Sequence, residues 1–191
     1  MSGDGLSERR RALEEAFFAK QNEALRLQLQ QAGDTKTKRE AFTVVSGITD
    51  GAVLDKLIAL GIDADTLAAL ALVPLVLVAW ADGTIDAKER GAVLSGAVET
   101  GLSKGNAGHE MLEGWLAKRP PPALLAAWKG YIGAISATLG AEAKAALKLQ
   151  LLGRARAVAE ATGGILGIGQ RISAAEEAVL RDLGAAFSVS A

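Results

Sequence analysis

Residues 67–81 read LAALALVPLVLVAWA, and residues 82–90, which follow them, read DGTIDAKER. The first stretch is the longest apolar run of the chain; Pro74 interrupts it and Asp82 closes it. A membrane-spanning helix needs about 20 apolar residues, so this run predicts a buried core helix instead. Because proline lacks the N–H that an interior helical turn needs, we expect that helix to bend at Pro74.

The composition of the 191-residue chain favours closely packed helices. Hydrophobic residues make up 50% of the chain but aromatic residues only 4%, and alanine and leucine, which supply most of this apolar content, have high helix propensity. The formal net charge of -1 predicts no general attraction to nucleic acid or to anionic lipid.

The chain contains no cysteine, which excludes disulfides, thiol catalysis and cysteine-bound zinc. This composition fits a reducing cytoplasm. The polar N-terminal sequence MSGDGLSERRR does not have the pattern of a signal peptide. We therefore expect a cytoplasmic protein with no integral membrane segment.

Helical periodicity, capping residues and glycine stop signals divide most of the chain into helices. Beyond the first 40 residues the predicted helices are Thr49–Leu60, Asp63 or Asp65 to Ala81, Asp86–Thr100, His109–Lys118, Leu124–Leu139, Ala141–Ala161 and Ser173–Phe187. Apart from the short GGILGIG at residues 163–169, which we expect to form a Gly-rich turn, no segment alternates as a strand does.

The first 40 residues differ from the rest in composition. Residues Leu6–Gln31 predict a charged, Gln-rich amphipathic helix, and GDTKTKRE at residues 33–40 predicts an exposed linker. We therefore divide the chain into an N-terminal arm, residues 1–40, and a domain, residues 41–191. The arm is suited to self-association or to docking in a partner groove. Alternatively, it folds back on the domain through Phe17, Phe18 and Leu25.

Two segments of the domain, residues 82–89 and 169–176, resemble each other. In register, Ile85 matches Ile172, Asp86 matches Ser173, and Glu89 matches Glu176. Each segment follows a long apolar helix and has the pattern of a capping box, in which the cap side chain and the glutamate three residues later bond each other's backbone N–H. The repeat predicts an all-α helical bundle of two quasi-repeated halves.

The same residues also suggest a cation site. Asp82, Asp86 and Glu89 place carboxylates around one tight turn and copy the second half of an EF-hand loop. The first half is missing, because Val78 and Trp80 stand where carboxylates are needed, so a conventional EF-hand is excluded. A divalent cation such as Ca²⁺ or Mg²⁺ could still bind here if the second half supplied oxygens, with Glu176 or Glu177 as the candidates. Helix capping alone and cation binding both remain open.

With VAWADG at residues 78–83, the motif Thr84-Ile85-Asp86-x-x-Glu89-Arg90 and its echo around Glu176, the chain resembles the tellurite-resistance TerB-like family over residues 67–187. That resemblance implies an all-helical fold of two quasi-equivalent halves. It also implies a binding or scaffold module of the kind linked to stress responses, with Asp82, Asp86 and Glu89 as the acidic cluster of the first half. Gly169 and Ser173 stand where the pattern has acids, so the second half departs from it.

Other candidate sites have ordinary structural explanations. His109, the only histidine, is predicted to lie at a surface helix start. GGILGIGQ lacks the lysine of a phosphate-binding loop, and Arg154 and Arg156 are expected to lie on a solvated helix face. The chain's tryptophans are expected to anchor the core or an interface, and these are Trp80, Trp115 and Trp128.

The sequence thus predicts a non-catalytic helical binding or scaffold module, responsive to a divalent cation, whose arm mediates self-association or partner docking. The first alternative is a metal-dependent enzyme that uses the acidic cluster. No nucleophile motif or phosphate loop supports it. The second is a stress-response protein that binds a membrane surface through the arm.

Overall fold

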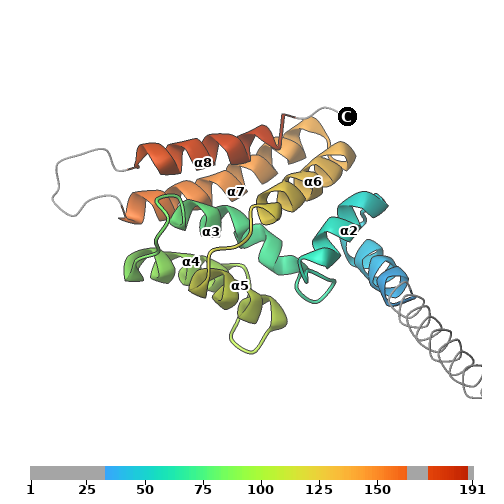
Figure 1. Ribbon diagram of the computed structural model, residues 1–191. Helices are drawn as coiled ribbons and strands as arrows, with labels where there is room; N and C mark the ends of the chain where they lie inside the picture. The colour runs from blue at the N-terminus through green and yellow to red at the C-terminus, as the bar shows by residue number, and fades with distance from the viewer. Residues whose placement is uncertain (1–32, 163–171, 189–191) are drawn as a thin grey trace, which may run out of the picture.

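The computed structural model describes residues 33–162 and 172–188, and every regular element in these two ranges is a helix (Figure 1). The predicted all-α fold is therefore confirmed. The elements are a helix over residues 33–46, α2 (Gly51–Ala59), the 3-10 helix η1 (Leu67–Leu72), α3 (Val73–Ala79), α4 (Ala87–Glu99), α5 (Ala107–Ala117), α6 (Ala123–Thr138), α7 (Ala141–Thr162) and α8 (Ala174–Ala185). Within the described ranges, no helix has the length and apolarity to cross a bilayer.

The apolar run forms two short helices instead of one bent helix. η1 ends at Leu72, and α3 begins at Val73 with Pro74 in its first turn. The single helix predicted from Asp63 or Asp65 to Ala81 is therefore wrong, because the chain changes from a 3-10 helix to an α-helix one residue before Pro74. The first N–H groups of an α-helix have no acceptor within the helix, so proline loses no hydrogen bond there, and its fixed φ suits the start of a helix.

The hydrophobic core surrounds α3. This helix packs against α4, α6, α7 and α8, while α2 packs on α6 and α5 packs on η1. α7 and α8 run antiparallel beside each other (Figure 1). One continuous apolar cluster extends from Phe42 to Phe187. That cluster includes residues from both predicted halves. A shared core does not show that the halves repeat each other, so the quasi-repeat stays a prediction.

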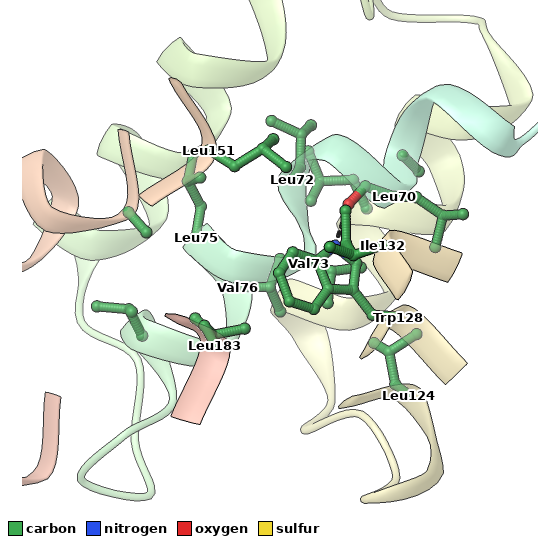
Figure 2. Close-up of a cluster of buried hydrophobic side chains, with 14 of the residues drawn as sticks. Leu70, Leu72, Val73, Leu75, Val76, Leu124, Trp128, Ile132, Leu151 and Leu183 are labelled. Carbon is green, nitrogen blue, oxygen red and sulfur yellow. Dashed lines mark hydrogen bonds between the residues drawn. The ribbon is translucent and has the colours of Figure 1, made fainter. Parts of the chain in front are cut away.

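Trp128 connects α6 to η1 and to Phe187, which follows α8. Its side chain is fully buried, and its Nε1 donates a hydrogen bond to the carbonyl oxygen of Leu70 at 3.0 Å (Figure 2). The ring of Phe187 lies edge-on to it, with 6.3 Å between the ring centroids. The polar end of the indole is therefore satisfied by the backbone of η1, as a buried tryptophan requires.

The segment predicted to be an exposed linker, residues 33–40, is mostly exposed but helical, since it belongs to the helix over residues 33–46. Two contacts hold this helix on the domain. Phe42 is completely buried in the core, and the guanidinium of Arg39 forms a two-pronged ion pair with the carboxylate of Asp55 in α2. The polar residues of the segment therefore form the solvated face of a helix. The predicted helix over Leu6–Gln31 lies outside the described residues.

The helix caps agree with the sequence except for small shifts. α2 is capped by Asp50 instead of Thr49, because the Asp50 carboxylate accepts from the N–H groups of Ala52 and Val53 at 2.9 and 3.2 Å. Aspartate ranks above threonine at this position. α5 begins at Ala107, two residues before the predicted start, with Asn106 as its cap.

Candidate functional site

The acidic segment begins with a tight turn that follows α3. Oδ1 of Asp82 accepts hydrogen bonds from the backbone N–H and the hydroxyl of Thr84, at 2.9 and 3.2 Å. Gly83 has a φ of 98° and donates its N–H to the carbonyl oxygen of Trp80 at 3.0 Å. The first role of Asp82 is therefore to fix the turn in which its own backbone lies.

Asp86 and Glu89 form the predicted capping box of α4. The Asp86 carboxylate accepts from the N–H groups of Lys88 and Glu89 at 2.7 and 2.8 Å, and Oε2 of Glu89 accepts from the N–H of Asp86 at 2.8 Å. These bonds satisfy N–H groups at the start of α4 that have no partner within the helix. The structure confirms the capping role of both acids.

The second segment caps α8 in the same way. The hydroxyl of Ser173 accepts from the N–H of Glu176 at 3.2 Å, and Oε2 of Glu176 accepts from the N–H of Ser173 at 2.6 Å. Ile85 and Ile172, which precede the two caps, are both partly buried against the core. The two segments therefore correspond in their local hydrogen bonds and in the partial burial of these isoleucines, while the repeat of the two halves stays a prediction.

The two capping boxes lie close enough for their charges to interact. Burial raises the pKa of the Glu89 carboxyl above its ordinary value of 4.5, and the negative charges of Asp86, Asp82 and Glu176 raise the pKa further, while the hydrogen bond from the Asp86 backbone opposes the shift. Glu177 instead lies against Arg156 on the surface, at 3.3 Å. Of the two glutamates considered for the second half, Glu176 is therefore the one that interacts with the first.

This acidic edge, made of Asp82, Asp86, Glu89 and Glu176, is occupied mainly with capping. Each of its carboxylates already accepts at least one backbone N–H. Within residues 33–162 and 172–188, no three acidic or histidine side chains are grouped as a ready-made metal site. The cation site predicted at these residues therefore stays a prediction.

His109 is not on the surface, contrary to the prediction. It is only 4% exposed, and within the described residues neither ring nitrogen forms a hydrogen bond; Nε2 lies 3.7 Å from Oε1 of Glu113. His109, Leu112 and Leu116 are spaced by three and four residues, and all are buried on α5, which packs on η1. That spacing is the signal in the sequence that His109 lies on the apolar face.

The tryptophans anchor the interior as expected. Trp128 is buried, while Trp80 and Trp115 are partly buried against the core. Nε1 of Trp80 donates to the carbonyl oxygen of Trp115 at 2.9 Å and so ties the end of α3 to α5. The Gly-rich segment GGILGIGQ lies outside the described residues.

The structure also contains an apolar cavity that no sequence pattern predicted directly. The Trp80 cavity, of about 550 Å³, is lined by Leu77 and Trp80 of α3, by residues 119–122, by Leu125 of α6, and by α8. These segments are far apart in the sequence, so periodicity within any one of them does not reveal the cavity. The triple proline of RPPP at residues 119–122 is the one local signal.

Searches with family models, with curated protein sequences and with solved structures find no match to this chain. The resemblance to the TerB-like family therefore stays a prediction.

Proposed function

We propose that this chain is a non-catalytic helical binding module that works in the cytoplasm. It associates, with a second copy or with a partner protein, through its N-terminal region, of which the structure describes the helix over residues 33–46. This is the kind of role that a TerB-like fold would imply. The observation that carries the proposal is the helix over residues 33–46, which is fixed on the domain at one face and carries apolar side chains on another.

The fixed face is defined by Phe42 and Arg39. Phe42 is fully buried, whereas Val44 and Val45 are 86% and 59% exposed. At 3.6 residues per turn, Val44 lies about 200° around the helix from Phe42. Because the anchored face holds the helix in place, the two valines are presented to solvent at a fixed position, as a preformed docking surface requires.

Light scattering on the full chain tests this proposal. Self-association predicts a mass above that of the monomer, and a fall toward the monomer mass when Val44→Asp and Val45→Asp are introduced together. Val98→Asp is the matched control, because Val98 is 68% exposed but lies on α4. If all three proteins are monomers, self-association fails. The docking alternative then depends on whether pull-down partners are lost with the double variant and retained with Val98→Asp.

A second candidate function, a response to divalent cations, is favoured by the convergence of the two capping boxes. The charges of Asp82, Asp86 and Glu176 all raise the pKa of Glu89, so these carboxylates repel one another. A hard cation such as Ca²⁺ or Mg²⁺, which prefers carboxylate oxygens, would relieve that repulsion. We propose the carboxylates of Asp82, Asp86, Glu89 and Glu176 as its ligands.

The test of the cation response is the melting temperature of the full chain with and without millimolar Ca²⁺ or Mg²⁺, since a ligand of the folded state stabilises it in proportion to the logarithm of its concentration. Asp82→Asn should reduce the rise, because asparagine keeps the turn but removes the charge. Asp65→Asn, at an exposed loop position, should leave the rise intact. An absence of any rise, or an equal loss with both variants, would contradict a site at the acidic edge.

A further inference from the structure

The Trp80 cavity has rigid walls. Trp80 lines it, and the Nε1 of this indole donates a hydrogen bond to the carbonyl oxygen of Trp115 at 2.9 Å. One wall is the triple proline of residues 120–122, in which each φ is fixed by its ring and no residue has an N–H group. Such a wall neither donates hydrogen bonds nor adapts its backbone, so the cavity is preformed for an apolar group.

The remaining walls are also apolar, because Leu77, Leu125 and Val179 line the cavity from α3, α6 and α8. The volume of about 550 Å³ falls in the range of roughly 300–1,000 Å³ that is usual for small-molecule sites. Cavities of this kind bind ligands through apolar contacts and use a few polar groups at the rim to orient them. The charged residues at the rim therefore decide which ligand fits.

Two charged residues, Arg119 and Asp182, stand at this rim. The carboxylate of Asp182 is paired with the ammonium group of Lys129. Arg119 forms no ion pair with any residue of the described ranges. Its Nη1 lies 3.9 Å from the point where a Cβ on Gly83 would stand, so the guanidinium covers the turn beside the cavity. Among the described residues, the rim thus offers one cation without an ion-pair partner and one neutralised acid.

We propose that the Trp80 cavity binds a small amphipathic monocarboxylate, with its hydrocarbon part against Trp80 and Leu125 and its carboxylate on the guanidinium of Arg119. The planar fork of arginine matches the two oxygens of a carboxylate. A single negative charge suits this rim, because Asp182 is already paired with Lys129 and, among the described residues, Arg119 is the rim cation without an ion-pair partner. This site is independent of the association proposed for the N-terminal helix.

Straight-chain carboxylates from hexanoate to decanoate, below their micelle concentrations, are the probes. Their binding to the full chain is followed by calorimetry and by the fluorescence of the tryptophans. Affinity should rise about fourfold with each added methylene until the cavity is filled. Decanoate should bind more tightly than decanol, and decylamine more weakly than either. Equal binding of decanoate and decylamine, or no binding at millimolar concentration, would overturn the proposal.

Two variants separate the carboxylate contact from the apolar one. Arg119→Gln, at an exposed position, should weaken decanoate binding about tenfold and leave decanol binding unchanged. The matched control is Arg181→Gln, an exposed position on α8 outside this cavity. Val179→Phe should weaken both probes because it narrows the cavity; circular dichroism and the melting temperature check that it folds. If Arg119→Gln and Arg181→Gln have equal effects, Arg119 is not the carboxylate partner. If a short apolar peptide with a free C-terminal carboxylate binds while decanoate does not, the cavity belongs to a protein partner and the proposal fails.

Discussion

Replacing glycine by alanine should have opposite effects at Gly83 and Gly91. Gly83 has a φ of 98°, in the region that side-chain-bearing residues avoid, although the nearest atom to an added Cβ is only Nη1 of Arg119 at an ordinary 3.9 Å. The cost of Gly83→Ala is therefore backbone strain alone, about 1–2 kcal/mol. Gly91 lies inside α4 with nothing within 4 Å of a new Cβ. Gly91→Ala should stabilise the fold by about 0.4–1 kcal/mol, because alanine restricts the unfolded chain and favours helix.

Thermal unfolding followed by circular dichroism measures both effects on the same scale. For a chain of this length 1 kcal/mol corresponds to roughly 2–4 °C, so Gly83→Ala should lower the melting temperature by about 2–8 °C and Gly91→Ala should raise it by about 1–4 °C. The double variant should show the sum, since the two positions share no contact. A neutral or stabilising Gly83→Ala would refute the left-handed turn after α3, and with it the geometry of the acidic edge.

Five further substitutions test the packing and the charges. Glu89→Gln keeps a capping side chain. Because the folded pKa of Glu89 is raised, its ionised form costs stability at neutral pH, and this variant should be more stable than the natural chain by about a few tenths of a kcal/mol at pH 7. The difference should disappear as the pH falls through the raised pKa toward 4.5. Trp128→Phe should cost about 2–4 kcal/mol, because it leaves a buried carbonyl without its donor, whereas Trp115→Phe, at a partly buried ring, should cost under about 1 kcal/mol in the same urea titration. Phe42→Ala should cost about 3–5 kcal/mol in urea unfolding if the helix over residues 33–46 belongs to the domain. Asp50→Ala should lower stability by about 1 kcal/mol through loss of the α2 cap, measured in the same way.

The features best predicted from the sequence are those that depend on a few neighbouring residues. The capping boxes at Asp86 and Ser173 follow from a four-residue pattern, and the structure confirms both. The same local rules allow two answers where neighbours compete. Thr49 and Asp50 can both cap a helix, and Pro74 can either bend a helix or begin one. For Thr49 and Asp50, the stronger capping preference of aspartate already favours the observed cap. For Pro74, the sequence of the segment alone does not decide between the two roles.

Features that depend on which surfaces meet could not be predicted in this way. The polar residues 33–40 suit a linker and an exposed helix equally well; burial of Phe42 and the ion pair of Arg39 with Asp55 decide for the helix. The polar and small residues next to His109 in sequence favour a surface position, whereas its spacing from Leu112 and Leu116 favours the apolar face. The packing of α5 on η1 decides for burial.

The end of α3 explains why the acidic edge and the Trp80 cavity are neighbours. All residues of α3 except Leu77 are buried, and none has a polar side chain, so the helix itself offers no side chain that could donate or accept a hydrogen bond. Polar side chains begin only where α3 ends. There Trp80 lines the cavity, and Asp82, two residues later, fixes the turn. Arg119 touches both places, because it lines the cavity and also covers Gly83. The apolar run that decides the fold therefore also places the turn of Asp82 and the Trp80 cavity beside each other.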